Sequence, residues 1–159
     1  MKIIVLSDTH SRSLPPQVRK ELPKADLIIH AGDICDTKML GEIEQINDVE
    51  AVYGNMDDQV LRKKLPRRLI LKYDGVCIGV LHGEGSPEHL IDHIKDEFKD
   101  EDVDVIIFGH SHEPFNKKID GVVFFNPGSP NDEIFAPYCS YGVIKIEGNS
   151  VKTKIVRVK

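Results

Sequence analysis

The stretch KIIVLSDTH, Lys2 to His10, begins as an unbroken apolar run and ends on a carboxylate and an imidazole. An apolar run without alternation is typical of a strand that is covered on both faces. We expect Asp8 and His10 to lie on an extended segment, where side chains two residues apart point to the same side. The stretch therefore predicts a buried strand that delivers two metal-competent side chains to one edge of a sheet.

The first third of the chain repeats this pattern with helices between the strands. Strands are predicted at residues 2–7, 26–33 and 49–55, and helices at residues 14–25 and 37–47. The resulting β-α-β-α-β order implies a parallel sheet with right-handed crossover connections.

The remainder of the chain predicts antiparallel pairing. Asp74-Gly75 joins two apolar runs within residues 68–83, which is a strong hairpin signal. Asp120-Gly121 and Gly148-Asn149 mark later hairpins, while residues 86–98 have a helical apolar stripe. The fold class is therefore mixed α/β, with two packed sheets and helices outside. Because no long linker divides the chain, we expect residues 1–159 to form a single domain.

Composition narrows the function classes. The chain has 159 residues and a net charge of -5, which argues against nonspecific binding to nucleic acid or anionic membranes. We find no leader-peptide pattern and no apolar run long enough to cross a bilayer. The three cysteines, Cys35, Cys77 and Cys139, lack metal-site spacing and suit a reduced compartment, so a cytoplasmic location is expected.

A further buried strand with a polar end is predicted within residues 103–112. Side chains that can bind metal ions stand at the ends of five of the predicted strands. They are Asp8 and His10, Asp33, Asn55, His82, and His110 with His112. Because the carboxyl ends of parallel strands share one edge of a sheet, these side chains can converge. Helix capping explains a single Asp or Asn at such a place, but it has no use for four histidines.

This set of side chains suits divalent Mn, Fe, Zn or Ni. The absence of cysteine from the strand ends disfavours a structural thiolate zinc site. Seven ligands are too many for one tetrahedral ion and fit two ions with one bridging carboxylate, an arrangement that supports attack on phosphorus.

Other polar residues have less specific interpretations. His30 is interpreted as a hydrogen-bonded core residue, and His89 with His93 as part of a solvent-facing helix rather than a two-histidine metal site. The basic run LRKKLPRR, residues 61–68, is interpreted as solvated surface, with attraction of an anionic substrate as the alternative. Residues 132–141 are equally consistent with an exposed patch for self-association and with core cover.

The motif series resembles that of the calcineurin-like metallophosphoesterases. The matching motifs are Asp8-x-His10, Gly32-Asp33, Gly54-Asn55-x-Asp57, His82-Gly83 and Gly109-His110-Ser-His112. The resemblance extends to Asn126–Ser129, and the compact spacing is similar to that of the small bacterial and archaeal YfcE-type phosphodiesterases. It implies a four-layer αββα sandwich of two mixed sheets, without a cap domain.

The resemblance also implies a dinuclear metal centre. One ion would be held by Asp8, His10, Asp33 and His112, and the other by Asp33, Asn55, His82 and His110, with Asp33 bridging. The implied ions are Mn or Ni, with Mg, Fe or Zn as alternatives. The implied reaction is in-line attack of a metal-bridging hydroxide on a small phosphodiester or nucleotide-like substrate, with Asp33, Asn55, Asp57, His82 and His110 as the catalytic set.

Two positions depart from the family pattern. Met56 stands where many relatives have a histidine that donates a proton or contacts phosphate, which disfavours leaving groups that need protonation. Glu84 follows His82-Gly83 where relatives often have a second histidine. One alternative to a phosphodiesterase is a noncatalytic protein-interaction scaffold on the same fold, which Met56 favours. Within the enzyme class a phosphomonoesterase is also an alternative, although Met56 argues against monoester chemistry.

Overall fold

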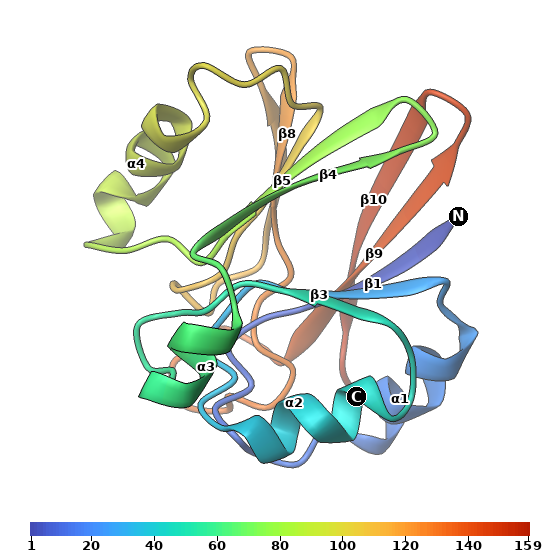
Figure 1. The fold of residues 1–159 in the computed structure, drawn as a ribbon, viewed down its shortest axis with the longest axis vertical. Coiled ribbons are helices and arrows are strands. Elements are labelled where there is room, and N and C mark those ends of the chain that lie inside the picture. The colour runs from blue at the N-terminus through green and yellow to red at the C-terminus, as the bar shows by residue number, and fades with distance from the viewer.

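The N-terminal strand lies at the centre of the first of two sheets in the computed structural model, which describes residues 1–159 (Figure 1). Strand β1, Lys2–Leu6, pairs in parallel with β2, Leu27–His30, which pairs in parallel with β3, Val49–Ala51. On its other side, β1 pairs antiparallel with β9, Ser140–Glu147, which pairs antiparallel with β10, Ser150–Arg157. The sheet order is β10-β9-β1-β2-β3, so the sheet is mixed.

The second sheet has the order β4-β5-β6-β8-β7 and is also mixed. Its strands are β4, Arg68–Tyr73; β5, Val76–Leu81; β6, Val105–Ile107; β7, Phe115–Ile119; and β8, Val122–Asn126. Asp74 and Gly75 both have positive φ, which is the backbone that a two-residue hairpin turn needs. The three predicted hairpins are confirmed.

Helices cover the outer face of each sheet, which gives four layers (Figure 1). Helices α1, Pro16–Glu21, and α2, Thr37–Glu44, pack with α3, Gln59–Lys64, on the first sheet. Helix α4, Leu90–Glu97, packs on the second sheet, and two short 3-10 helices lie at Leu22–Lys24 and Pro87–His89. None of the helices combines the length and hydropathy that crossing a membrane requires.

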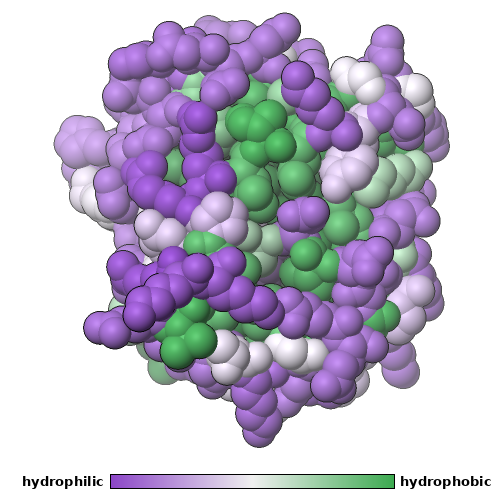
Figure 2. Space-filling view, viewed as in Figure 1, coloured by the Kyte–Doolittle hydropathy of each residue, from purple (hydrophilic) through white to green (hydrophobic).

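One apolar cluster lies under the helices of each sheet, and a further apolar cluster fills the space between the two sheets. Ile3, Val5 and Ile29 of the first sheet meet Ile78 and Ile107 of the second, and all five are fully buried. Since both faces of β1 are covered, its unbroken apolar run is explained. On the face seen in Figure 2, apolar residues gather over the strands and hydrophilic residues surround them. The predicted αββα sandwich of two mixed sheets is confirmed.

One local prediction was wrong, and one helix was not predicted. Strand β1 ends at Leu6, and Asp8 and His10 have φ values of 56° and 48°, so the segment that carries them is not extended. Helix α3 was also missed, although Asp58 accepts a hydrogen bond from the N–H of Leu61 as its N-cap and basic residues occupy its last turn. Both are signals of a helix.

Candidate metal centre

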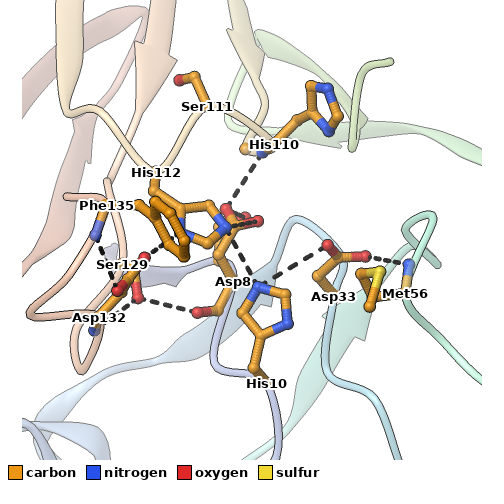
Figure 3. A network of polar contacts seen from close by, with 12 residues as sticks. Asp8, His10, Asp33, Met56, His110, Ser111, His112, Ser129, Asp132 and Phe135 are labelled. Atoms are coloured by element: carbon orange, nitrogen blue, oxygen red, sulfur yellow. Dashed lines mark hydrogen bonds and ion pairs between the residues drawn. The ribbon is translucent and has the colours of Figure 1, made fainter. Parts of the chain in front are cut away.

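The structure brings the seven predicted ligands together where the two sheets end. Figure 3 labels Asp8, His10, Asp33, His110 and His112 among them. The ligand atoms of Asp8, His10 and His112 lie within 4.8 Å of one another, and so do those of Asp8, Asp33 and His82. The remaining two residues join the second group. Oδ1 of Asn55 lies 3.1 Å from Nε2 of His82 and 3.1 Å from Nδ1 of His110.

Left-handed backbone, rather than strand alternation, aims these side chains. Five of the seven residues have positive φ, which is uncommon outside glycine and is concentrated at functional sites. They are Asp8, His10, Asp33, His110 and His112. The loops after β1 and β2 also support each other, since the N–H groups of Asp8 and His10 donate to the carbonyls of Gly32 and Asp33, each at 3.0 Å.

Two glycines allow the close approach of loops at the centre. A Cβ on Gly109 would lie 1.9 Å from Oγ of Ser7 and 2.7 Å from Oδ2 of Asp8. A Cβ on Gly54 would lie 2.2 Å from Oδ1 of Asp33. Glycine is therefore required at both positions if the two carboxylates are to keep their places.

Each of the four histidines uses one ring nitrogen for an outer partner and turns the other toward the cluster. Nδ1 of His82 contacts the carbonyl of Ala31 at 2.7 Å, and Nε2 of His110 contacts the carbonyl of Gly85 at 2.8 Å. Nδ1 of His112 contacts Asp132, and Nδ1 of His10 lies 3.4 Å from Sγ of Cys35. Carbonyl and carboxylate partners fix the tautomer and ring orientation of a metal-binding histidine.

The two oxygens of the buried Asp8 carboxylate differ in their hydrogen bonding. Its Oδ2 accepts hydrogen bonds from Ser7 Oγ at 2.6 Å and from the N–H of His110 at 3.1 Å. Its Oδ1 is buried without a hydrogen-bond partner and lies 3.3 Å from Nε2 of His112. A buried carboxylate oxygen that no donor satisfies is costly unless a cation binds it, so the residues present fit a metal ion.

Asp33 faces both halves of the cluster. Its Oδ2 lies 3.3 Å from Nε2 of His82 and 3.9 Å from Nε2 of His10, and these histidines belong to different predicted ligand sets. Its Oδ1 accepts the N–H of Met56 at 2.7 Å. One oxygen facing both sets is the arrangement that a bridging carboxylate needs.

The electrostatics of the cluster favour positive charge. Burial opposes charge on His82, but the contacts with Asp33 and Asp8 outweigh it and raise the pKa of His82 to about 9. The contact with Asp8 raises the pKa of His112 to about 9 as well. Burial alone would raise the pKa of Asp8. The contacts with His112 and His82 lower this pKa by a larger amount, so its net shift is downward. A divalent cation would supply the same positive charge and displace the protons.

The chain matches the model of one family over most of its length. The calcineurin-like phosphoesterase superfamily domain covers residues 1–149, including every residue of the cluster described above. The chain belongs to the calcineurin-like phosphoesterase superfamily. The resemblance inferred from the motif series is therefore confirmed.

Individual relatives agree with this assignment. A probable metallophosphoesterase of Methanothermobacter thermautotrophicus is 33% identical over 99% of this chain and 92% of its own length. A phosphodiesterase of Methanocaldococcus jannaschii is 28% identical over 80% of this chain and 83% of its own length. The crystal structure of Chaetomium thermophilum Vps29, which is 23% identical, has the same fold, with a TM-score of 0.86 over 100% of this chain and 86% of that chain.

In this phosphoesterase, the residues that depart from the family pattern lie outside the ligand cluster. Met56 is 59% exposed. The side chain of Glu84 is 64% exposed and lies 3.6 Å from His93 and 3.8 Å from Arg67, at the wall of a pocket that Asn55 and His82 also line. Asp57 is buried and accepts the N–H groups of Gly54, Asp33 and Cys35, and it contacts no histidine. Asp57 therefore holds two ligand loops together.

The family motifs do not include several residues that support the centre. Ser7 and Asp132 were missed by sequence reasoning, and only the position of Ser7 beside Asp8 could have suggested a role. Asn126 begins the last segment covered by the resemblance, and its Nδ2 donates to the carbonyl of Gly109 at 2.9 Å. Ser129 Oγ donates to the carbonyl of Asp8 at 2.8 Å. His30 is confirmed as a buried core residue, 3.1 Å from Oγ1 of Thr9.

Proposed function

We propose that this phosphoesterase is a dinuclear-metal-dependent phosphodiesterase, formed by residues 1–159 as one domain. Asp8, His10, Asp33 and His112 would hold one ion, and Asp33, Asn55, His82 and His110 the other. The observation that carries the proposal is the buried, unpartnered Oδ1 of Asp8 among histidines that each present a ring nitrogen. A fold kept only for its shape would gain nothing from that costly arrangement.

The proposed ions supply Lewis-acid activation of water and neutralisation of phosphoryl charge. The protein's part is to hold and orient. Ala31, Gly85 and Asp132 fix three imidazole rings, while Asp57 ties the Asp33 loop to the Asn55 loop. Preorganised groups of this kind lower the reorganisation that the reaction requires.

A diester is the preferred substrate class because the site offers no proton donor where the family histidine would stand. Met56 cannot protonate a leaving oxygen, so leaving groups that are stable as anions are favoured. A relative that is named a phosphodiesterase supports the same class. We therefore propose a small phosphodiester or nucleotide-like molecule as substrate in the cytoplasm, Mn²⁺ or Ni²⁺ as the working ions, and no specific binding of nucleic-acid polymers.

The test is hydrolysis of bis-p-nitrophenyl phosphate and of p-nitrophenyl phosphate by chelator-stripped protein, with Mn²⁺, Ni²⁺, Zn²⁺ or Mg²⁺ added back. We expect metal-dependent turnover that favours the diester and is lost in Asp33→Asn. Preference for the monoester would replace the proposal with a phosphomonoesterase.

Two exposed apolar residues favour a second function, that of a noncatalytic protein-interaction scaffold. Ile134 and Phe135 are largely exposed beside the centre, and Phe135 packs edge-on against the ring of His112 with centroids 6.5 Å apart. Exposed apolar side chains of this size are common at protein interfaces, including those between identical chains. Tight binding of two ions without turnover of either ester would favour the scaffold over the enzyme.

A further inference from the structure

A pocket of about 170 Å³ opens beside the candidate metal centre and shares two of its residues. Asn55 and His82 line it on the side of the metal centre, and Arg62, Arg67, His93 and Glu84 also line it. Since a water molecule occupies about 30 Å³ of liquid, the pocket has room for a group of several non-hydrogen atoms. A substrate whose phosphorus lies at the metal centre can therefore place a substituent in this pocket.

Arg62 is fixed in the pocket wall by the loop that carries Asn55. Its Nε donates to the carbonyl of Asp57 at 2.9 Å and its Nη2 to the carbonyl of Asn55 at 2.6 Å. Its guanidinium also lies over the ring of Tyr53, 5.6 Å from the centroid. These contacts hold the cation in place but use only some of its five N–H donors.

The charge of Arg62 is not balanced by any carboxylate within 4.0 Å, in contrast to that of its neighbour. Arg67 forms two hydrogen bonds of 2.8 Å to Glu97, and Glu84 lies 3.8 Å from its Nη2. His93, which sequence analysis assigned to a solvent-facing helix, is half-buried between the same two carboxylates. Arg62 is thus the cation in this pocket that remains available for an anion.

We propose that this pocket binds a second anionic group of the substrate and that Arg62 is the residue that recognises it. The substrate class is then a phosphodiester that carries a further phosphate or carboxylate a few bonds from the scissile phosphorus. A guanidinium with several free donors in a fixed position is well suited to pair with such oxygens. This inference deepens the proposed phosphodiesterase function and rests on it for the identity of the bound molecule as a substrate.

The test compares two ligands of equal length that differ only at the far end. Both 3-phosphonopropionate and propylphosphonate offer a phosphonate to the metal centre, but only the first offers a carboxylate to the pocket. Calorimetric titration of the Mn²⁺-loaded protein should show that 3-phosphonopropionate binds about tenfold more tightly, as expected for one charge-assisted contact.

Two substitutions make the comparison specific. In Arg62→Gln the two ligands should bind with equal affinity, because 3-phosphonopropionate loses its additional contact while propylphosphonate has none to lose. Lys63→Gln removes the same charge from an exposed neighbour on the same helix and should keep the preference. Arg62→Lys, which keeps the charge and loses the fork of donors, should retain part of it.

The inference is overturned if the wild-type protein binds both ligands equally. It is also overturned if Arg62→Gln weakens both to the same extent, because Arg62 would then only support the Asn55 loop. Turnover of bis-p-nitrophenyl phosphate, measured in parallel, separates the two claims. Turnover without a ligand preference would refute only the proposal of an anion pocket. A ligand preference without turnover would refute the proposed phosphodiesterase activity and leave the anion pocket supported.

Discussion

The carboxylate of Asp132 accepts a hydrogen bond from Nδ1 of His112 and thereby fixes the orientation of that imidazole ring. Its other oxygen accepts the N–H groups of Ile134 and Phe135 at 2.9 and 3.2 Å. One side chain therefore couples a candidate metal ligand to the turn that carries the exposed Phe135 (Figure 3). A carboxylate on the outer nitrogen of a histidine also increases the basicity of the inner nitrogen.

Asp132→Asn should weaken metal binding without removing a ligand. The amide keeps the size of the side chain but loses the charge that orients His112, and losses of about 10- to 100-fold in affinity are typical of such outer partners. Competition between the protein and a chelator for Zn²⁺ measures the change. Glu133→Gln, on the exposed neighbour, is the matched control and should bind as the wild type does. Unchanged affinity in Asp132→Asn would mean that Asp132 serves the turn alone.

Much of the fold could be predicted from the sequence because its signals are local. Continuous apolar runs mark β1 and β2, and Asp-Gly pairs mark hairpins through the positive φ that those residues tolerate. The convergence of the site residues follows from a general property of parallel strands, so the set could be named without any coordinates.

The remaining features could not be predicted because they depend on contacts between distant segments. Asp132 lies 20 residues after His112 and belongs to no motif. The left-handed backbone of Asp8 and His10 is imposed by hydrogen bonds to the Gly32 and Asp33 carbonyls of another loop. The pocket lined by Arg62 could not be predicted either. Arg62 belongs to the basic run of residues 61–68, and such a run is usually solvated surface.

Gly109→Ala should disrupt the centre. The new Cβ would overlap Oγ of Ser7 and press on Oδ2 of Asp8, and both side chains are fully buried. Overpacking of this kind costs about 1–3 kcal/mol. We expect a loss of that size in the free energy of unfolding in urea with chelator present, together with at least about tenfold weaker metal binding, since Asp8 must move.

Gly41→Ala is the control for this substitution. Gly41 lies within α2, and no atom lies within 4 Å of a Cβ added there. Alanine should therefore stabilise the protein by about 0.5–1 kcal/mol through the lower conformational entropy of its unfolded chain. Equal effects of the two substitutions would show that the close contacts at Gly109 relax without cost.

His30 should make the metal-free protein sensitive to acid. Burial is the largest cause that lowers the pKa of His30, from 6.5 to about 3. Between these pH values the unfolded chain binds a proton that the folded protein does not, so stability is lost as the pH falls below 6.5. From pH 8 to pH 5 this one residue should remove about 2 kcal/mol.

The substitution His30→Gln isolates this contribution from those of other titrating groups. At pH 8 the variant loses the contacts of His30 with Thr9 and Gly32 and should be less stable than the wild type. At pH 5 the deficit should be about 2 kcal/mol smaller, because glutamine does not bind the proton. Urea unfolding at the two pH values, with chelator present, measures the difference. A deficit that does not change with pH would show that His30 is not buried in its neutral form.

Met56→His should place a proton donor beside Asp33, the proposed bridging carboxylate. The N–H of Met56 donates to Oδ1 of Asp33, and Met56 is exposed, so a histidine at this position would lie beside Asp33 without displacing a ligand. General acids contribute about 10²- to 10⁴-fold when the leaving group needs a proton, so we expect at least about tenfold faster hydrolysis of methyl phenyl phosphate. Methyl p-nitrophenyl phosphate, whose leaving group is stable as an anion, should change little.

The ratio of the two rates separates proton donation from other effects of the substitution. Met56→Gln, which has a similar size and no titratable group, should leave the ratio at the wild-type value. An equal gain with both esters would mean that histidine assists phosphate binding instead. No gain with either would mean that position 56 does not face the leaving group, and the preference for good leaving groups would then need another cause than the loss of a histidine at this position.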